Sequence, residues 1–367
     1  MDTIGDPRWQ TAAREARTTL EDARARHGLP ALSVAVMIDG RLVWAAATGW
    51  SDLERAIPAS LATRYRLGSS SKAITATALA RLVEKGAMSL DAPISTWRQD
   101  LPNSAWNALT PRQLASHTAG IVDYDQNRDL VGLFHSLREG KQFASVGEAL
   151  SVFDGNGLKY TPGTDFRYTS FDTVLLSAAI AGAADKPFLD VLDEEIARPL
   201  AVPSLSADYQ DRAVPDRATF YARGENGLRR WRRVNHSYKW ASGGLIASSS
   251  DLARIGAGWL NAAYITPQTR NAFWEQQRLA NGEANEQNYA IGWRSNSNRS
   301  LLGLEQPVWH VHHGGVSKGA YSWLVIYPDL DIVVALNANA RLDNFQDFIA
   351  IEQAITRNFA TEPELAK

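Results

Sequence analysis

The sequence contains no cysteine. This absence excludes disulfide bonds, thiolate metal sites and a cysteine nucleophile, and it leaves the redox compartment undetermined. Long apolar runs are also missing: none approaches the roughly 20 residues that span a bilayer, so we expect no membrane span. The opening segment MDTIGDPRWQTAAREA lacks a basic stretch followed by an apolar one. We therefore expect no secretory signal here, and the compartment stays open between the periplasm, if a signal was removed, and the cytoplasm.

An excess of charge of one sign is missing as well. Lys and Arg number 38 and Asp and Glu 40, for a formal net charge of −2, and neither sign forms a long run. This balance argues against a nucleic-acid partner. The seven histidines show no metalloprotease spacing, and although His310 and His312 would share one side of a strand, zinc needs further ligands. We expect neither a metal nor another cofactor.

The chain changes its periodicity along its length. A helical pattern covers residues 8–27, and an apolar hairpin follows with Asp39-Gly40 at its turn. Most segments within 69–183 have helical periodicity. Short apolar strands then return as YAIGW, VWHVHH, AYSWLVIYP and DIVVALNAN, before a closing helix over about 344–359. Strands at both ends with helices between them predict that the terminal segments share one sheet.

The segment RLGSSSKAITATALARLVEKG carries the first candidate site. Of its serines only Ser69 stands three residues before Lys72, and residues at i and i+3 share a helix face. This spacing brings an amine to the hydroxyl, while the helix N-terminus supplies a positive field for a developing oxyanion. Ser70 and Ser71 point elsewhere. The alternative is a serine-rich helix cap followed by an exposed lysine.

Two further segments carry candidates. In YTPGTDFRYTSFDTVLLSAAI, Tyr168 and Ser170 follow a turn and precede an apolar helix. A tyrosine beside a lysine can have its pKa lowered toward neutrality, which suits a general acid or base; the alternative is a buried aromatic beside a capping serine. In VWHVHHGGVSKGAYSWLVIYP, the paired glycines Gly314 and Gly315 end a predicted strand. Such glycines let backbone approach a ligand, and their N–H groups can hold an oxyanion.

In order and wide separation these three elements resemble those of the serine β-lactamase-like and penicillin-binding-protein superfamily. Within it the sequence looks most similar to the mitochondrial β-lactamase-like serine proteases and their bacterial relatives, through segments that include LTPRQLASHTAGI and NHSYKWASGGLIASSSDLARIG. The resemblance implies an α+β fold of the β-lactamase/transpeptidase type. Residues 1–66 and 235–367 would form an antiparallel sheet flanked by helices, residues 67–234 an inserted helical region, and the active site the cleft between them.

The resemblance also implies catalytic roles. Ser69 would be the acylated nucleophile and Lys72 the group that accepts its proton. Tyr168 would share the proton transfer and protonate the leaving group. The backbone N–H groups of Ser69 and Gly315 would form the oxyanion hole.

Other matching positions would bind substrate. Ser170 takes the third place of the family's Tyr-x-Asn element, His312 the place of the lysine in Lys-Thr-Gly, and Gly314 that of its glycine. Tyr238 and Trp240 are candidates to line the cleft, with plain core aromatics as the alternative reading.

Two departures limit the comparison. Ser170 stands where many relatives have Asn, and His313 replaces the usual Thr or Ser, so hydrolysis of antibiotics does not follow. His117, in the SHTAG turn, is interpreted as structural, because nothing in its spacing links it to Ser69.

We expect acyl transfer through a covalent Ser69 intermediate on a small peptide or amide. A carboxylesterase or a weak β-lactamase of the same superfamily is the alternative. A metal-dependent hydrolase is a third reading. From another class, the chain would be a structural or binding protein with a vestigial site, assembling into homo-oligomers.

Overall fold

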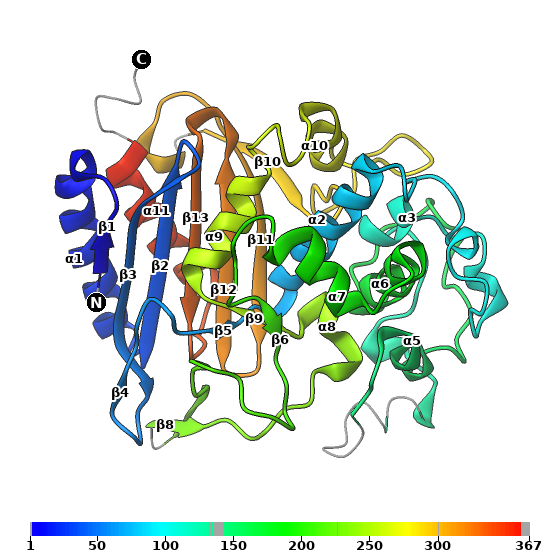
Figure 1. The fold of residues 1–367 in the computed structure, drawn as a ribbon, viewed down its shortest axis with the longest axis horizontal. Helices are drawn as coiled ribbons and strands as arrows, with labels where there is room; N and C mark the ends of the chain where they lie inside the picture. The colour runs from blue at the N-terminus through cyan, green and yellow to red at the C-terminus, as the bar shows by residue number, and fades with distance from the viewer. Residues whose placement is uncertain (1, 132–133, 135–141, 226, 300, 361–367) are drawn as a thin grey trace.

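The computed structural model describes residues 2–131, 134, 142–225, 227–299 and 301–360. Its centre is an antiparallel eight-stranded sheet in the order β1-β3-β2-β13-β12-β11-β10, with β4 paired to β3 (Figure 1). As predicted, both ends of the chain supply the strands. They are β1 (Asp2–Ile4), β2 (Ala31–Ile38), β3 (Arg41–Asp52), β4 (Ile57–Pro58), β10 (Arg294–Asn298), β11 (Val308–Ser317), β12 (Ala320–Tyr327) and β13 (Ile332–Ala338).

The predicted hairpin joins β2 to β3. Its two turn residues, Asp39 and Gly40, have φ values of 50° and 70°. Positive φ at both positions matches the right-handed twist of the flanking strands, and Asp-Gly adopts it at low cost. The hairpin is therefore set by local sequence.

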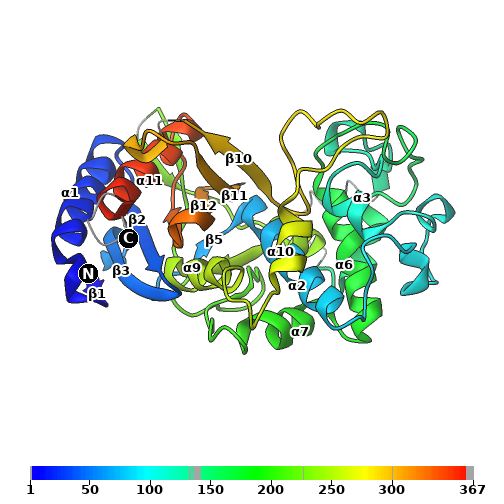
Figure 2. The same ribbon diagram turned by 90° about the horizontal axis from the view of Figure 1, so that it is seen from above.

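Helices cover both faces of the sheet. α1 (Gln10–Arg26) and α11 (Phe345–Ala360) lie together on one face, and α9 (Ser249–Gly258) and α2 (Ser71–Glu84) lie on the other (Figure 2). The buried apolar residues accordingly form two large clusters, one against α1 and α11 and one against α2 and α9. The helices predicted at the two ends of the chain are confirmed, with ends shifted by one or two residues.

The remaining elements lie mostly between β4 and β10 in the chain. The helices are α3 (Pro111–Ala115), α5 (Val146–Ala149), α6 (Ser170–Ala184), α7 (Phe188–Leu192), α8 (Trp240–Gly243) and α10 (Pro267–Trp274). Short strands form a three-stranded sheet and a hairpin, namely β5 (Tyr65–Arg66), β6 (Ser206–Ala207), β9 (Leu245–Ala247), β7 (Tyr221–Gly224) and β8 (Gly227–Arg230). The predicted α+β class is confirmed, while the division at residues 66 and 235 stays a prediction. Over the described ranges, no helix has both the length and the apolar character to cross a bilayer.

The strand predicted for YAIGW, residues 289–293, is wrong. β10 begins only at Arg294, and Gly292 has a φ of 75° that a strand does not allow. A Cβ on Gly292 would lie 2.3 Å from the Cβ of Ala76 on α2. The alternating apolar residues are buried because this turn packs against a helix, a contact that periodicity cannot reveal.

Candidate active site

Ser69 and Lys72 lie in contact at the start of α2. Ser69 belongs to a single 3₁₀ turn, η2 (Gly68–Ser70), which runs directly into the helix. In a 3₁₀ turn, residues at i and i+3 eclipse one another. Lys72 Nζ donates to Ser69 Oγ at 3.2 Å. The predicted spacing therefore brings the two side chains together.

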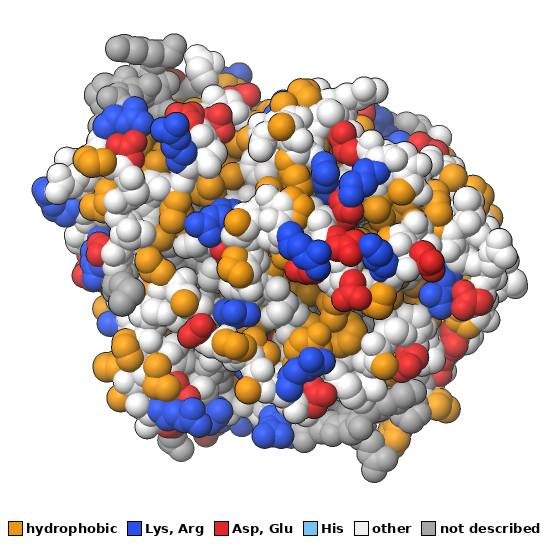
Figure 3. Space-filling view, viewed as in Figure 1, with side chains coloured by type: hydrophobic (Ala, Val, Ile, Leu, Met, Phe, Trp, Pro, Cys, Tyr) orange, Lys and Arg blue, Asp and Glu red, His pale blue; other side chains and the backbone are white. Residues whose placement is uncertain are grey.

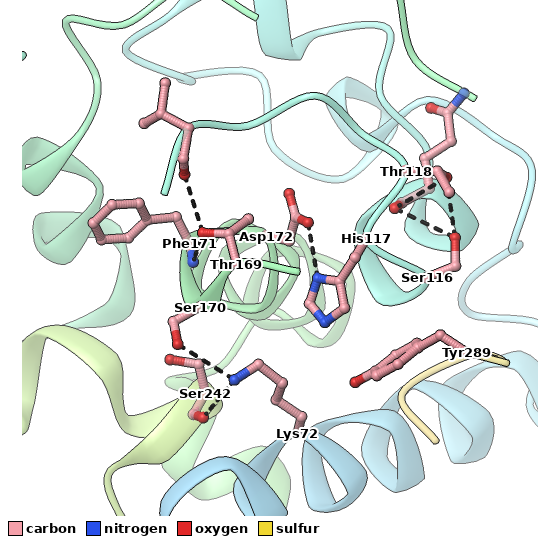
Figure 4. Close-up of polar contacts among 12 residues, drawn as sticks. Lys72, Ser116, His117, Thr118, Thr169, Ser170, Phe171, Asp172, Ser242 and Tyr289 are labelled. Carbon is pink, nitrogen blue, oxygen red and sulfur yellow. Dashed lines mark hydrogen bonds and ion pairs between the residues drawn. The ribbon is translucent and has the colours of Figure 1, made fainter. Parts of the chain in front are cut away.

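Lys72 is buried, with 2% of its surface exposed. Its Nζ also donates to Ser170 Oγ at 3.3 Å and to the Ser242 carbonyl at 3.0 Å (Figure 4). Burial lowers the pKa of Lys72, and the charges of Lys239 and Arg294 lower it further, while Tyr168 opposes them. The uncharged amine, which can accept a proton, is therefore more accessible than in an exposed lysine.

Tyr168 adjoins this pair. Lys72 Nζ lies 4.7 Å from the centroid of the Tyr168 ring, and the Arg294 guanidinium lies 5.3 Å from it. The backbone here is held by Thr169, which caps α6 by accepting from Phe171 N–H at 3.2 Å and donates to the Val122 carbonyl at 3.0 Å. These two hydrogen bonds fix the backbone at Thr169, and Tyr168 and Ser170 are its neighbours in the chain.

His117 belongs to this group, although its place in the sequence indicated a structural role. Its Nδ1 lies 2.9 Å from Asp172 Oδ2 (Figure 4). Its ring centroid lies 4.5 Å from that of Tyr168 and 4.7 Å from that of Tyr289. His117 is connected to Lys72 through Tyr168, which contacts both side chains. The spacing of the SHTAG turn in the sequence does not indicate this tertiary contact.

The pair of His117 and Asp172 is fully enclosed. Burial raises the pKa of Asp172 well above its usual value and lowers that of His117 well below, so burial disfavours the charged form of both side chains. Neither His117 Nε2 nor Asp172 Oδ1 has a hydrogen-bond partner among the residues that the structure describes. The group beside Lys72 thus contains buried polar atoms without a protein partner.

Of the three histidines in β11, the neighbours His312 and His313 face opposite sides of the sheet. His313 Nε2 lies 2.9 Å from the Tyr289 hydroxyl, on the side of Tyr168. The His312 ring packs against the Trp323 ring, with their centroids 4.6 Å apart, and forms a hydrogen bond with Asn296, on the side of α11. The resemblance implied that His312 lies at the site with Ser69. The structure does not bring the two together, because successive side chains of a strand alternate between its faces. His313 takes that face.

The glycines alternate in the same way. A Cβ on Gly315 would lie 1.8 Å from the Leu67 carbonyl oxygen, so only glycine lets η2 come this close. A Cβ on Gly314 would instead lie 2.7 Å from the Phe345 ring, on the α11 face. Gly315 therefore borders the candidate site and Gly314 does not.

The pairing of β10 with β11 determines which N–H groups of β11 point toward the site. The Ser295 N–H donates to the Asn288 carbonyl, away from β11. N–H groups of an antiparallel strand alternate in direction, so those of Arg294 and Asn296 face β11, opposite His312 and His310. The N–H groups of His310 and His312 therefore face β10. By the same alternation the N–H of Val316 points to the β10 side of β11, beyond the end of β10.

Gly68 brings Ser69 to that N–H group. A Cβ on Gly68 would lie 2.9 Å from the Val316 nitrogen, and the φ of Gly68 is 50°. The geometry thus favours the N–H groups of Ser69 and Val316 for an oxyanion, in place of the Gly315 N–H, which by alternation faces β12. Val316 replaces Gly315 for the same reason that His313 replaces His312: the positions inferred from the resemblance lie one residue too early in the strand.

Tyr238 and Trp240 are both buried beside the start of α8. Lys239 Nζ lies 5.3 Å from the Tyr238 ring, and Trp240 packs edge-on against Tyr209 at 6.0 Å. These contacts match the core-aromatic reading for Trp240, and a substrate role for either residue stays a prediction. Among the described residues, no group of three or more His, Cys, Asp or Glu is arranged to hold a metal ion.

Comparison with known proteins identifies the family and the fold. The family model described as Beta-lactamase matches residues 16–355. The mitochondrial serine beta-lactamase-like protein LACTB of Homo sapiens is 25% identical over 398 residues, which cover 87% of this chain and 72% of that protein.

Solved structures share the fold. The D-amino acid amidase from Ochrobactrum anthropi SV3, complexed with L-phenylalanine amide, superposes with a TM-score of 0.76 at 19% identity, over 95% of this chain and 98% of that one. EstCE1, a hydrolase with promiscuous acyltransferase activity, superposes with a TM-score of 0.75 at 19% identity, over 95% of this chain and 99% of that one. The fold predicted from the three motifs is confirmed.

Proposed function

The chain belongs to the Beta-lactamase family, a family of serine hydrolases, and on this premise we propose that it hydrolyses small peptide or amide bonds through an acyl-enzyme on Ser69. One observation carries the proposal. A buried lysine donates to Ser69 Oγ at 3.2 Å, in surroundings that lower its pKa. A lysine held in this way serves as a general base rather than as a solvated surface charge.

In acylation, the neutral Lys72 amine takes the Ser69 hydroxyl proton as Oγ attacks the substrate carbonyl. The negative oxygen that forms is held by the N–H groups of Ser69 and Val316. Such donors act most strongly on charge that develops during the reaction. The start of α2 adds its own positive field.

The leaving amine then needs a proton. Tyr168 is the proposed donor, because Lys72 Nζ lies 4.7 Å from its ring centroid, so the proton taken from Ser69 has a short route to the phenol. The C–N bond breaks as nitrogen is protonated, and the acyl group stays on Ser69. Water, deprotonated by the same groups, releases the acid and restores Ser69.

Amides are the first choice of substrate for two reasons. The relatives that share the fold include an amidase, whose complex contains an amino acid amide. Two proton carriers, Lys72 and Tyr168, also suit an amine, which leaves poorly unless it is protonated.

Esters are the second choice. Ser170, where relatives have Asn, is engaged with Lys72 at 3.3 Å and is shorter than an amide side chain. It therefore offers less hydrogen bonding to a substrate amide, a loss that matters less for an ester.

A fluorophosphonate probe tests whether the site is catalytic at all. We expect covalent labelling of the wild type and of Ser71→Ala, and none of Ser69→Ala. Ser71 is the control because it is a serine two residues from Ser69, at the first position of α2. Labelling that survives Ser69→Ala, or a complete lack of labelling, would favour a binding protein with a vestigial site.

A substrate panel tests the finer proposal. It contains D- and L-aminoacyl amides, p-nitrophenyl esters and a β-lactam, each assayed with wild type and Ser69→Ala. Ser69-dependent amide turnover supports the proposal. Turnover of esters alone favours the second choice, and activity lost with EDTA would indicate a metal hydrolase instead.

A further inference from the structure

A cavity of about 580 Å³ lies beside the foot of the large sheet and shares no residue with the group around Lys72. It is bounded by the end of β3 with β4, by β5, by the segment 213–220 and by the β7–β8 hairpin with the residues that follow it. Its volume falls within the range of about 300–1,000 Å³ that is usual for small-molecule sites. Nothing in the proposed hydrolytic chemistry uses it.

The lining of this cavity is strongly basic. Two carboxylates, Asp52 and Asp216, face it together with six guanidinium groups. These belong to Arg55, Arg66, Arg217, Arg230, Arg232 and Arg233. Figure 3 shows basic side chains gathered over β8 at the lower left of the molecule.

Most of these arginines form no ion pair. Arg66 and Arg217 both pair with Asp208, at 2.6 and 3.1 Å. For the other four no ion pair occurs within the described ranges, although the charge of Arg230 acts on Asp52. Asp52 is already engaged, since it accepts from the Thr219 hydroxyl at 2.7 Å and from the Arg55 backbone N–H at 3.0 Å. The protein therefore leaves a surplus of positive charge around one cavity.

Arg66 gives the cavity a rigid floor. It is 6% exposed, its guanidinium carbon lies 4.1 Å from the Phe220 ring centroid, and its Nε and Nη1 donate to Asp208 and to the Lys318 carbonyl. Its Nη2 donates to no residue that the structure describes. A buried guanidinium with one nitrogen left over is a preorganised donor.

We propose that this cavity binds a ligand that carries phosphate groups. Several guanidinium forks that converge from different elements match the oxygens of a phosphate, and such charge-assisted bonds are about twice as strong as neutral ones. Trp231, which also lines the cavity, adds a flat apolar surface beside the charge. The phosphate can belong to a soluble small molecule or to a lipid headgroup, and the same arginines would contact either.

The first test is calorimetric titration of the full chain with pyrophosphate, at low and at physiological salt. We expect the triple variant Arg230→Gln/Arg232→Gln/Arg233→Gln to weaken binding about tenfold or more. The matched control is Arg14→Gln/Arg41→Gln/Arg299→Gln, which removes the same charge from exposed positions outside the cavity. The control should bind like the wild type.

Two further arms identify the source and the chemistry of the ligand. Co-sedimentation with phosphatidylglycerol vesicles, against phosphatidylcholine vesicles, detects a headgroup; cavity-dependent vesicle binding without pyrophosphate binding would assign the phosphate to a lipid. Citrate tests whether any polyanion suffices.

The proposal is overturned if the control triple loses as much binding as the cavity triple, if citrate binds as tightly as pyrophosphate, or if neither phosphate source binds. Ester or amide turnover by the cavity triple, at the wild-type level, confirms that the variant is folded.

Discussion

On the α11 face of the sheet Glu352 accepts hydrogen bonds from Trp323, Tyr327 and Thr356, whereas on the α2 face Asp172 has one described partner, His117. Both carboxyl groups are enclosed, at 0% and 1% exposure. Burial raises the pKa of Glu352 to about 7, where its hydrogen bonds restrain it, and that of Asp172 well above its usual value. The two carboxyl groups are equally buried, and they differ in the number of hydrogen bonds that they accept.

The difference bears on Lys72. An ionised carboxylate beside a lysine favours the ammonium form, which cannot accept a proton. The charge of Lys72 acts on Asp172, but burial is the larger influence and disfavours the carboxylate form. Burial of Asp172 therefore weakens a charge that would favour the ammonium form of Lys72, whereas the hydrogen bonds of Glu352 hold α11 to the sheet.

The largest expected effect comes from removing the base itself. Lys72→Ala should lower kcat/KM for an amide substrate about 10³-fold, because it removes general base catalysis. Melting temperature should change little or rise, since a buried polar amine, which is costly to remove from water, is lost with it. Steady-state kinetics and thermal melting check both points.

Ser70→Ala and Ser71→Ala are the controls for this prediction. Ser70 Oγ donates to the His313 carbonyl and Ser71 Oγ accepts from the Leu245 N–H, so both side chains are engaged in packing at the start of α2. We expect them to retain kcat/KM within about fivefold. A loss at Ser70 as large as that at Lys72 would mean that the wrong hydroxyl was assigned.

The next effect belongs to the α11 face and appears in stability. The raised pKa of Glu352 means that the folded state holds its proton more tightly than the unfolded state. The resulting stabilisation is present below about pH 4.5 and is lost as the pH rises to about 7. It amounts to a few kcal/mol, because each tenfold difference in proton affinity between the folded and unfolded states is worth about 1.4 kcal/mol.

Urea unfolding of wild type and Glu352→Gln across pH 5 to 8 checks this. The free energy of unfolding of the wild type minus that of Glu352→Gln should fall as the pH rises, because glutamine does not titrate. Contributions from the other titrating groups are common to both proteins and cancel. Turnover per folded molecule should be equal. A pH-independent difference would show that Glu352 does not titrate in this window.

The two faces also show how far sequence reasoning reached. The Ser69-to-Lys72 contact, the Asp39-Gly40 hairpin and the shared sheet depend on local rules of spacing and turn chemistry, and they were predictable. The contact of His117 with Tyr168 joins segments that are about 50 residues apart and has no local signature. Choosing between His312 and His313 required the register of β11 against β10, and sequence alone does not give it.

That choice yields the third prediction. His313→Asn should lower kcat/KM about tenfold, because His313 lies on the face of Tyr168 and bonds to the Tyr289 hydroxyl. His312→Asn, its neighbour on the other face, should change kcat/KM less than twofold. Equal losses from both variants, at equal folded fractions, would contradict the alternation argument.

Asp172→Asn should have the smallest effect, with kcat within about threefold of wild type. If the pair is uncharged, the Asp172 carboxylic acid donates to His117 Nδ1, and an asparagine amide can replace that donor at the same place. The substitution then changes no charge near Lys72. The acid limb of the kcat/KM profile against pH should therefore keep its position.

The pH profile makes this small effect informative. If Asp172 were ionised in the folded enzyme, Asn would remove a negative charge beside Lys72, lower the lysine pKa, and move the acid limb to lower pH. Asp172→Ala is the contrasting variant, since it leaves His117 Nδ1 without its partner and frees the ring that packs against Tyr168. A loss of about tenfold with alanine, beside an unmoved limb with asparagine, would assign Asp172 to holding His117 in place rather than to supplying charge.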